Sequence, residues 1–139
     1  MPSRGQLTGM RGVYLVAAEL AKRGFVASPT SRSAYGADVL VTDPECRRSF
    51  SVQVKTNARA PGFWLVGQKA TTVTSKTHIY VLVNLHSHRN DERPEFFVVP
   101  SRVLAKKVRK AGRANSTWYS VHRPAVESYR EKWSVFGEP

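Results

Sequence analysis

The sequence predicts a single-domain α/β fold, and three observations support this prediction. First, 139 residues suit one domain with a hydrophobic core of ordinary size. Second, apolar residues recur at helical spacing near the N-terminus and again after residue 100. Third, short apolar runs typical of β-strands lie between these two helical patterns. A helix, mixed strands and a helix in that order are expected to form one layered α/β domain.

The first helix is predicted from about Met10 to Arg23. Its apolar positions repeat every three or four residues: Val13, Val16, Ala17 and Leu20. Gly24 follows two basic residues, which is a usual end of a helix. Residues 1–9 are polar and contain glycine, so we expect them to form a loose arm before this helix.

The next segments predict a short strand and then a β-hairpin. Phe25–Ser28 is short and apolar enough for a strand, and residues 29–36 form a polar loop. Asp38–Thr42 (DVLVT) and Ser49–Thr56 are expected to be the two arms of the hairpin. The segment DPECRR between them has the Asp-Pro chemistry of a turn.

Further strands are predicted in the second half of the chain. After the break NARAPG at 57–62, Phe63–Val66 is expected to form a short strand. Ile79–Leu85 (IYVLVNL) is apolar almost throughout, so it is expected to be a central strand covered on both faces. The polar loop at 86–94 would connect it to a return strand, Glu95–Val99.

Two helices complete the predicted fold. One opens at Ser101 and is expected to run to about Lys110, with Gly112 ending it. From Trp118 the chain is expected to be extended, with a last helix near Ala125–Trp133.

The charge of the chain indicates a polyanionic partner. Lysine and arginine number 22 against 10 acidic residues, which gives a formal net charge of +12 and a sequence pI ≈ 10.5. Nucleic acid is the expected partner, ahead of an anionic membrane surface. Charge alone predicts affinity for phosphate and does not identify any chemistry.

Several classes of protein are not expected. No run approaches the roughly 18 apolar residues of a membrane span, so no membrane association by a span is expected. The N-terminus MPSRGQLTGMRG lacks the apolar core of a secretion signal. Cys46 is the only cysteine, so an internal disulfide is excluded, which fits a cytoplasmic protein. Zinc is not expected, because no Cys/His set has ligand spacing.

The residues that best indicate chemistry lie on the predicted hairpin. Gln53 and Lys55 share a face of one strand, and pairing would bring Asp38 of the other arm beside them. Asp38, the Gln53 amide and the Val54 carbonyl can supply the oxygen ligands that a hard cation such as Mg²⁺ prefers. Lys55 would hold or activate the attacking water and balance charge in the transition state. The expected chemistry is hydrolysis of a phosphodiester.

The same residues carry a resemblance to a known family. GAD at 36–38 and QVK at 53–55 resemble the motif of the PD-(D/E)XK nuclease superfamily, in the QxK form of Mrr-like members. Glu19, in VAAELAKRG, is similar to the helix glutamate of Holliday junction resolvase-like members. The part of the chain that carries the resemblance runs from about Gly9 to Thr56.

This resemblance implies a restriction-endonuclease-like mixed β-sheet flanked by helices, in one domain over residues 1–139. It implies a DNA endonuclease, structure-selective or resolvase-like, that acts on double-stranded or branched DNA as a homodimer. It also implies Mg²⁺ as the cofactor, with Mn²⁺ as a substitute. The catalytic residues would be Glu19, Asp38, Gln53 and Lys55, and the metal ligands Asp38, Gln53, Val54 and Glu19.

The sequence departs from the pattern at two positions. Ala37 stands where the superfamily has proline, and Gln53 stands where a carboxylate would bind a divalent ion more strongly. One alternative is therefore a catalytically inactive nucleic-acid-binding module on the nuclease fold. Another is a basic structural or RNA-associated protein whose motif is accidental. Glu19 also has an alternative, an ion pair with Arg23 at i+4.

Nucleic-acid contacts are predicted outside the motif as well. Arg32 lies in the loop before Asp38, and Tyr35 in the same loop can stack on a base or sugar. Lys69 is expected at the rim of the cleft. The segment SRVLAKKVRKAGR at 101–113 carries cations that form either a phosphate-binding face or a solvated exterior of the predicted helix: Lys106, Lys107, Arg109, Lys110 and Arg113.

Overall fold

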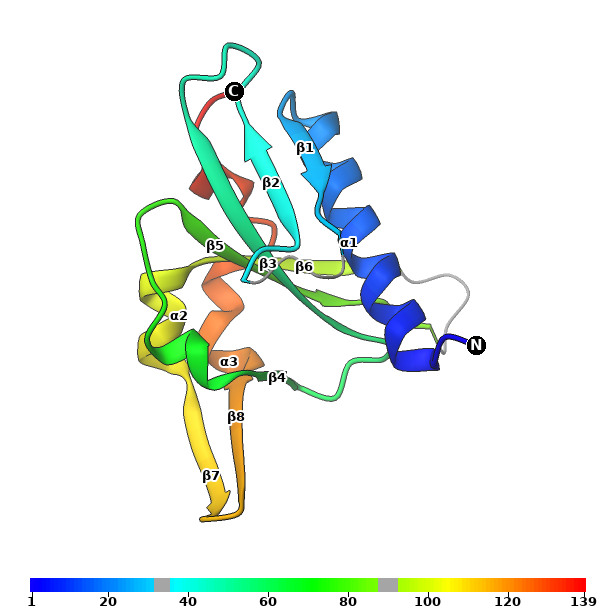
Figure 1. Cartoon of the computed structure of the whole chain (residues 1–139), viewed down its shortest axis with the longest axis vertical. Coiled ribbons are helices and arrows are strands. Elements are labelled where there is room, and N and C mark those ends of the chain that lie inside the picture. Colours follow the sequence, from blue (N-terminus) through cyan, green and yellow to red (C-terminus); the bar gives the residue numbers. More distant parts are fainter. Residues whose placement is uncertain (32–35, 88–92) are drawn as a thin grey trace.

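The computed structural model describes residues 1–31, 36–87 and 93–139 (Figure 1). In chain order these residues form α1 (Arg4–Lys22), β1 (Val26–Pro29), β2 (Val39–Thr42), β3 (Ser49–Asn57), β4 (Phe63–Val66), the 3₁₀ helix η1 (Gln68–Thr71), β5 (His78–Asn84), β6 (Glu95–Pro100), α2 (Ser101–Lys107), β7 (Arg109–Arg113), β8 (Ser116–His122), α3 (Arg123–Val126) and the 3₁₀ helices η2 (Glu127–Tyr129) and η3 (Trp133–Phe136).

The main sheet is mixed, in the order β1-β2-β3-β5-β6. β3 and β5 are parallel, and the other neighbours in this sheet are antiparallel. Every residue of β5 is buried, as expected for an apolar central strand. The predicted hairpin is β2–β3, and the predicted α/β class is confirmed.

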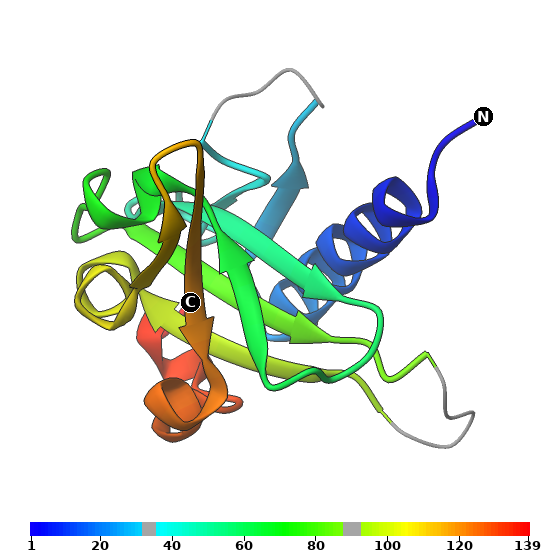
Figure 2. The same cartoon turned by 90° about the horizontal axis from the view of Figure 1, so that it is seen from below.

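Two hydrophobic clusters cover the two faces of this sheet. On one face, Val16 and Leu20 of α1 pack with Trp133 and Phe136 near the C-terminus. The other face is covered by α2 and a second sheet, β4-β8-β7. Figure 2 shows α1 on one side of the strands and α2 with β7–β8 on the other. Within the described ranges, the helices are too short or too polar for any of them to cross a membrane.

Helix α1 begins earlier than the apolar pattern predicts. Ser3 accepts a hydrogen bond from the backbone N–H of Gln6, and the Gln6 side chain accepts one from Ser3, which is a capping box. Because this cap satisfies the first N–H groups, the helix extends back to Arg4. The expected loose arm over residues 1–9 is therefore corrected, since most of that segment is helical.

The predicted helix from Ser101 to about Lys110 is also corrected. α2 ends at Lys107, where Val108 turns to extended backbone, and Arg109 begins β7. Between Val108, which packs on the core, and Trp118, the chain has no large apolar side chain for a helix to bury. Pairing with β8 instead satisfies the backbone of this polar segment.

The C-terminal helix is also shorter than predicted. Only α3 is α-helical, and η2 and η3 are single 3₁₀ turns. Arg130 is extended and forms a bridge with Phe97, and Glu131 has φ +52°. A helix cannot pass through this conformation, so the segment Ala125–Trp133 is broken into short pieces.

A buried carboxylate joins β6 to the C-terminal segment. Glu95 accepts two hydrogen bonds from Arg123, at 2.8 and 2.7 Å, and lies 3.2 Å from Arg130. His86 and Asn84 also contact its Oε1, at 2.7 and 3.3 Å. Burial alone would raise the pKa of Glu95, but the hydrogen bonds from Arg123, His86 and Asn84 and the charge of Arg123 lower it to about 2.

Candidate active site

Asp38 lies directly before β2, and its side chain satisfies the edge of β3. The paired part of β2 and β3 ends at Val39 and Val52, so the backbone N–H of Val54 lies beyond the ladder. Asp38 Oδ2 accepts a hydrogen bond from this N–H at 2.8 Å. The backbone of Asp38 is itself held, because its N–H donates to Val52 and its C=O accepts from Thr30. These bonds fix the carboxylate at an open strand edge.

The carbonyl of Val54 faces the same edge as this carboxylate. The N–H and C=O of one strand residue point toward the same neighbour. Ser51 donates to Thr77 and Asn57 accepts from Leu85, so the odd-numbered residues of β3 direct their backbone groups toward the β5 side. Val54 has the opposite parity, and its carbonyl therefore points to the side where Asp38 lies.

Gln53 and Lys55 lie beside Asp38, as the hairpin predicted. Gln53 Nε2 donates to Asp38 Oδ2 at 3.0 Å. Both residues line two cavities. The smaller one has a volume of about 590 Å³ and is also lined by Asp38, Val54 and the first half of α1. The larger one has a volume of about 730 Å³ and lies on the other side of Gln53 and Lys55. The structure thus brings together Asp38, Gln53, Val54 and Lys55, and their catalytic and metal-binding roles stay predictions.

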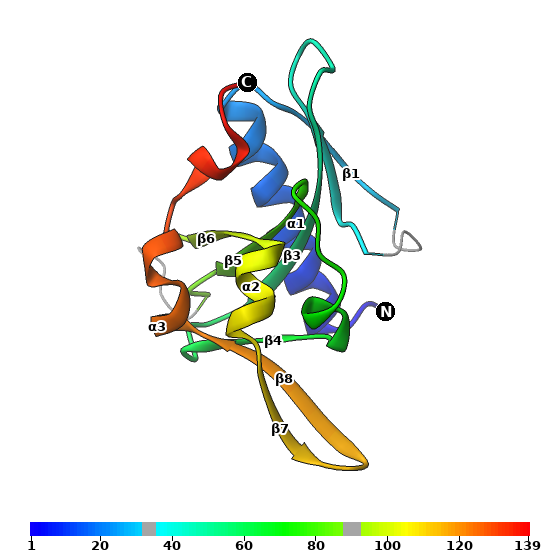
Figure 3. The ribbon, with the colours of Figure 1, turned by 90° about the vertical axis from the view of Figure 1, so that its left-hand side faces the viewer.

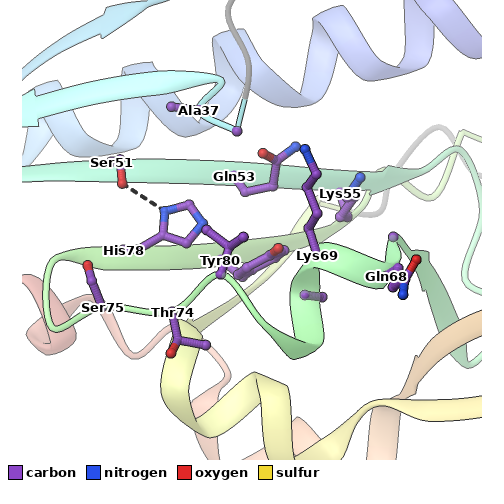
Figure 4. A pocket seen from close by; sticks show the side chains of 14 residues that line it. Ala37, Ser51, Gln53, Lys55, Gln68, Lys69, Thr74, Ser75, His78 and Tyr80 are labelled. Atoms are coloured by element: carbon purple, nitrogen blue, oxygen red, sulfur yellow. Dashed lines mark hydrogen bonds between the residues drawn. The ribbon is translucent and has the colours of Figure 1, made fainter.

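The larger cavity adds residues that the sequence analysis did not select. Ser51 of β3 and His78 of β5 are register partners, and Ser51 Oγ lies 2.7 Å from His78 Nδ1 (Figure 4). Tyr80, the partner of Gln53, lies in the same cavity. Lys69 extends from η1 toward the strand that carries Gln53, so its predicted place at the rim agrees with the structure. His78 and Tyr80 alternate along a strand, but only the β3–β5 register shows that they face the motif.

The side chains of His78 and Tyr80 both favour their neutral forms. Burial lowers the pKa of His78, and the hydrogen bond to Ser51 opposes this effect only in part. Burial also raises the pKa of Tyr80, and the charge of Asp38 adds to the rise. Near neutral pH the cavity therefore offers an uncharged imidazole and phenol beside the cations Lys55 and Lys69.

Glu19 is not brought to this site. The residues of α1 that line the smaller cavity come from its first half: Gln6, Gly9, Met10, Val13 and Tyr14. Glu19 lies further along the helix and forms an ion pair with Arg23 at i+4. Arg23 in turn lies over the Trp133 ring, 4.6 Å from its centroid. The structure thus places Glu19 in the helix ion pair of the alternative, and not among the residues that line the smaller cavity.

The other predicted nucleic-acid contacts fall in different places. Arg32 and Tyr35 lie outside the described residues. Lys106 and Lys107 form the last turn of α2. Arg109 and Lys110 lie on β7 and not on a helix, so they do not share the helical face that was predicted.

The donor set at the strand edge fits a hard cation with few protein ligands. Mg²⁺ is usually held by one or two carboxylates, and water and substrate phosphate oxygens complete its coordination. The Asp38 carboxylate and the Val54 carbonyl can supply such ligands. In the described parts of the chain, no three His, Cys, Asp or Glu side chains gather at one point. Gln53 presents its N–H to Asp38, so it would offer its amide oxygen only after the amide turns over.

Comparison with known proteins identifies the class of fold. No protein-family model matches the sequence, and no curated protein matches it. Among solved structures, Hjc, a Holliday junction resolvase from the archaeal hyperthermophile Archaeoglobus fulgidus, is similar with a TM-score of 0.58 and 13% sequence identity, over 94% of this chain and 97% of that one. The bacterial homing endonuclease I-Ssp6803I is similar with a TM-score of 0.64 and 19% identity, over 97% of this chain and 91% of that one.

The chain therefore has a restriction-endonuclease-like fold, with a five-stranded mixed sheet flanked by helices. The fold that the resemblance around Asp38 and Lys55 implied is therefore confirmed. At these identities the likeness concerns the fold.

Proposed function

We propose that this protein is a divalent-metal-dependent endonuclease that hydrolyses phosphodiester bonds in DNA. One observation supports this function most. The Asp38 carboxylate, the Val54 backbone and the Lys55 side chain meet at one open strand edge, next to two cavities. The fold is also that of a resolvase and a homing endonuclease. A net charge of +12 would attract DNA to this edge.

The proposed reaction forms a bond between a water oxygen and phosphorus and breaks the bond from phosphorus to a sugar oxygen. The water loses a proton to solvent, and the leaving oxygen takes one up. The Lys55 ammonium would donate hydrogen bonds to the water or to a phosphate oxygen and offset the negative charge that develops. Asp38 and Val54 would hold Mg²⁺ or Mn²⁺, and the bound ion would polarise the phosphate and acidify its water.

Cleavage of both strands of a duplex in a single binding event needs two such sites. We infer that the enzyme acts as a homodimer, in which each copy cuts one strand. Light scattering of the protein with and without duplex DNA measures the mass of the complex, and a complex with one protein copy would contradict this inference.

One observation favours a second candidate function, a binding module that no longer cleaves. Gln53 stands beside Asp38 as an uncharged hydrogen-bond donor, so the edge carries less negative charge than a pair of carboxylates would. A site with less negative charge binds a divalent ion more weakly. Under this alternative the protein binds DNA through its cations and leaves it intact.

An assay with several substrates separates the two functions. Supercoiled plasmid, branched DNA and single-stranded DNA are incubated with the wild type in Mg²⁺ or Mn²⁺, and binding is measured in EDTA. The endonuclease proposal predicts metal-dependent cleavage of at least one substrate, and a loss of about a hundredfold or more in Lys55→Ala.

Lys22→Ala is the matched control, because it removes one exposed lysine from the last turn of α1, away from the cavities. It should cleave at nearly the wild-type rate. Binding without cleavage of any substrate in either metal would overturn the endonuclease and support the binding module.

A further inference from the structure

β7 and β8 form an antiparallel ribbon that projects from the end of the molecule where α1 begins (Figures 1 and 3). β8 pairs with β4 only through residues 119–122. The pairs Ala111–Trp118, Gly112–Thr117 and Arg113–Ser116 therefore extend beyond the body. Three pairs span about 10 Å at about 3.4 Å per residue. The outer part of the ribbon is thus an exposed two-stranded arm.

The tip of this ribbon is tightly closed. Gly112 has φ +106°, and a Cβ atom there would lie 2.0 Å from the Ser116 carbonyl oxygen. Only glycine fits this conformation and this close approach. The backbone at Gly112 therefore fixes how the two strands of the ribbon meet at the tip.

The two faces of the ribbon differ in chemistry. Tyr119 and Val121 of β8 point to the hydrophobic cluster under the second sheet. Because side chains alternate along a strand, Trp118 points to the opposite, outer face. The register places Arg109 and Arg113 on that outer face too, opposite Ser120 and Ser116. Trp118 is 55% exposed, whereas Trp64 is 1% exposed.

The charge of the ribbon is of one sign. No aspartate or glutamate occurs in the sequence between Glu95 and Glu127. Lys106 and Lys107 end α2 directly before the ribbon, so further cations lie at its root. An exposed tryptophan between two arginines, on a positively charged arm, offers both stacking and charge-assisted hydrogen bonds to a nucleic acid.

We propose that the β7–β8 ribbon inserts into the major groove of duplex DNA. The groove is about 12 Å wide and about 8.5 Å deep and admits a two-stranded ribbon, so about 10 Å of free ribbon reaches its floor. Arg109 and Arg113 contact guanine edges or phosphates, Trp118 packs on bases or sugars, and Lys106 and Lys107 contact the flanking phosphates. This inference rests on the proposed function only in that DNA is the ligand.

The same geometry discriminates between nucleic acids. The major groove of an A-form RNA duplex is deep and too narrow for side chains to read. Single-stranded DNA has no groove at all. The ribbon should therefore favour duplex DNA over duplex RNA and over a single strand of the same sequence.

A second copy of the chain is the competing occupant of this surface. The outer face continues across β4, where Phe63 and Leu65 are exposed. Two copies meeting there would bring Arg109 and Arg113 close to their own equivalents, without a carboxylate on the ribbon to compensate. Like charges across an interface are unfavourable, so charge complementarity favours DNA.

The first test measures binding in EDTA by fluorescence anisotropy with labelled duplex DNA, duplex RNA and single-stranded DNA. The double variant Arg109→Ala/Arg113→Ala should bind duplex DNA about tenfold or more weakly than the wild type. The matched control is Lys22→Ala/Arg47→Ala, which removes two exposed cations that are not on the ribbon. It should weaken binding by about threefold at most, since its charges lie outside the contact.

The second test uses the fluorescence of Trp118. Duplex DNA should change the emission of the wild type and protect it from iodide quenching, and Trp118→Phe should remove both effects. This readout does not depend on cleavage. An emission that is unchanged at saturating duplex would overturn the proposal.

Three further outcomes also test the ribbon proposal. Equal losses in the ribbon variant and the control would attribute binding to net charge and overturn the proposal. Conversion of a wild-type dimer to a monomer by the ribbon variant, with duplex affinity unchanged, would assign the surface to self-association and overturn it too. If the ribbon effects appear but no DNA is ever cleaved, the ribbon proposal stands and the endonuclease proposal fails.

Discussion

Asp38 contributes to both the fold and the candidate site. Its carboxylate accepts the Val54 N–H, which the end of β2 would otherwise leave without a partner, and it accepts the Gln53 amide through the same oxygen. An asparagine at this position can still accept the backbone hydrogen bond through its oxygen while it removes the negative charge. Asp38→Asn is therefore the substitution that separates the chemistry from the fold.

Gln53→Glu is expected to make the stability of the fold depend on a divalent ion. Without metal, the variant loses the hydrogen bond to Asp38 and places two carboxylates side by side, which should lower the free energy of unfolding by about 1 to 3 kcal/mol. With Mg²⁺ the paired carboxylates share the ion, so the melting temperature should rise more than that of the wild type. Thermal unfolding with and without Mg²⁺ measures both effects.

Gln68→Glu is the control for this prediction. Gln68 is an exposed amide that lines the larger cavity but does not line the smaller cavity with Asp38. Its substitution should leave the response to Mg²⁺ at the wild-type level. An equal response in the two variants would argue against an ion at Asp38.

Glu95 makes the stability of the fold depend on acid pH. Its pKa is about 2 in the folded chain and near its ordinary value of 4.5 when unfolded, a difference worth about 3 kcal/mol. Because the folded pKa is the lower one, this stabilisation is complete above pH 4.5 and is lost as the pH falls toward 2. Glu95→Gln should therefore cost about 3 kcal/mol at pH 7 and much less near pH 2, as measured by urea unfolding.

Glu127→Gln is the matched control, since Glu127 also pairs with Arg123 but is half exposed. An exposed ion pair contributes about 1 kcal/mol or less, so this variant should show a small cost at every pH. A cost for Glu95→Gln that stayed constant between pH 7 and pH 2 would exclude this linkage.

At the scale of elements, α1 approaches β3 most closely at Gly12, where no room is left for a side chain. A Cβ atom at Gly12 would lie 1.9 Å from Thr56 Oγ1 and 2.8 Å from Thr56 Cβ, whereas nothing lies within 4 Å at Gly9. Gly12→Ala should therefore destabilise the fold by about 1 to 3 kcal/mol. Gly9→Ala should stabilise it by about 0.5 to 1 kcal/mol, because alanine is the better helix former.

Thermal unfolding of these two variants tests where the helix packs. They make the same chemical change three residues apart on one helix. Equal effects would mean that α1 does not approach β3 at Gly12, and that the smaller cavity is not bounded as described.

Local sequence predicted the elements whose pattern and pairing are both local. The β2–β3 hairpin follows from DVLVT, a turn and an alternating strand, and it brought Asp38 to Gln53 and Lys55. The segment after Ser101 was different, because its pattern permits a helix through Lys110. The pairing of β7 with β8, set by contacts later in the chain, decides that the helix stops at Lys107.

The parts of the site that could not be predicted depend on register between distant strands. Ser51, His78 and Tyr80 meet only because β3 and β5 are parallel neighbours across some twenty residues of intervening chain. No pattern within β5 indicates which strand it will join. Glu19 differs from these residues, because its partner is local. The family resemblance assigned it to the site, but it forms an ion pair with Arg23 on the same helix.

At the scale of the whole molecule, contacts between the cations of this +12 chain and DNA phosphates should make its affinity for DNA depend on salt. If six to ten phosphates are contacted, binding should weaken by roughly 10³ to 10⁵-fold between 50 and 200 mM salt. Anisotropy titrations in EDTA at several KCl concentrations measure this slope. A flat dependence would show that phosphate contacts do not carry the binding.

The central claim is that Asp38 and Lys55 mark a phosphodiesterase site on a nuclease fold. The most direct test is the rate of plasmid nicking in Mg²⁺ by the wild type, by Asp38→Asn, and by Glu45→Gln, an exposed carboxylate in the turn between β2 and β3. The claim predicts nicking by the wild type and by Glu45→Gln, and a loss of about a hundredfold or more in a folded Asp38→Asn protein. Equal nicking rates in all three proteins would contradict it.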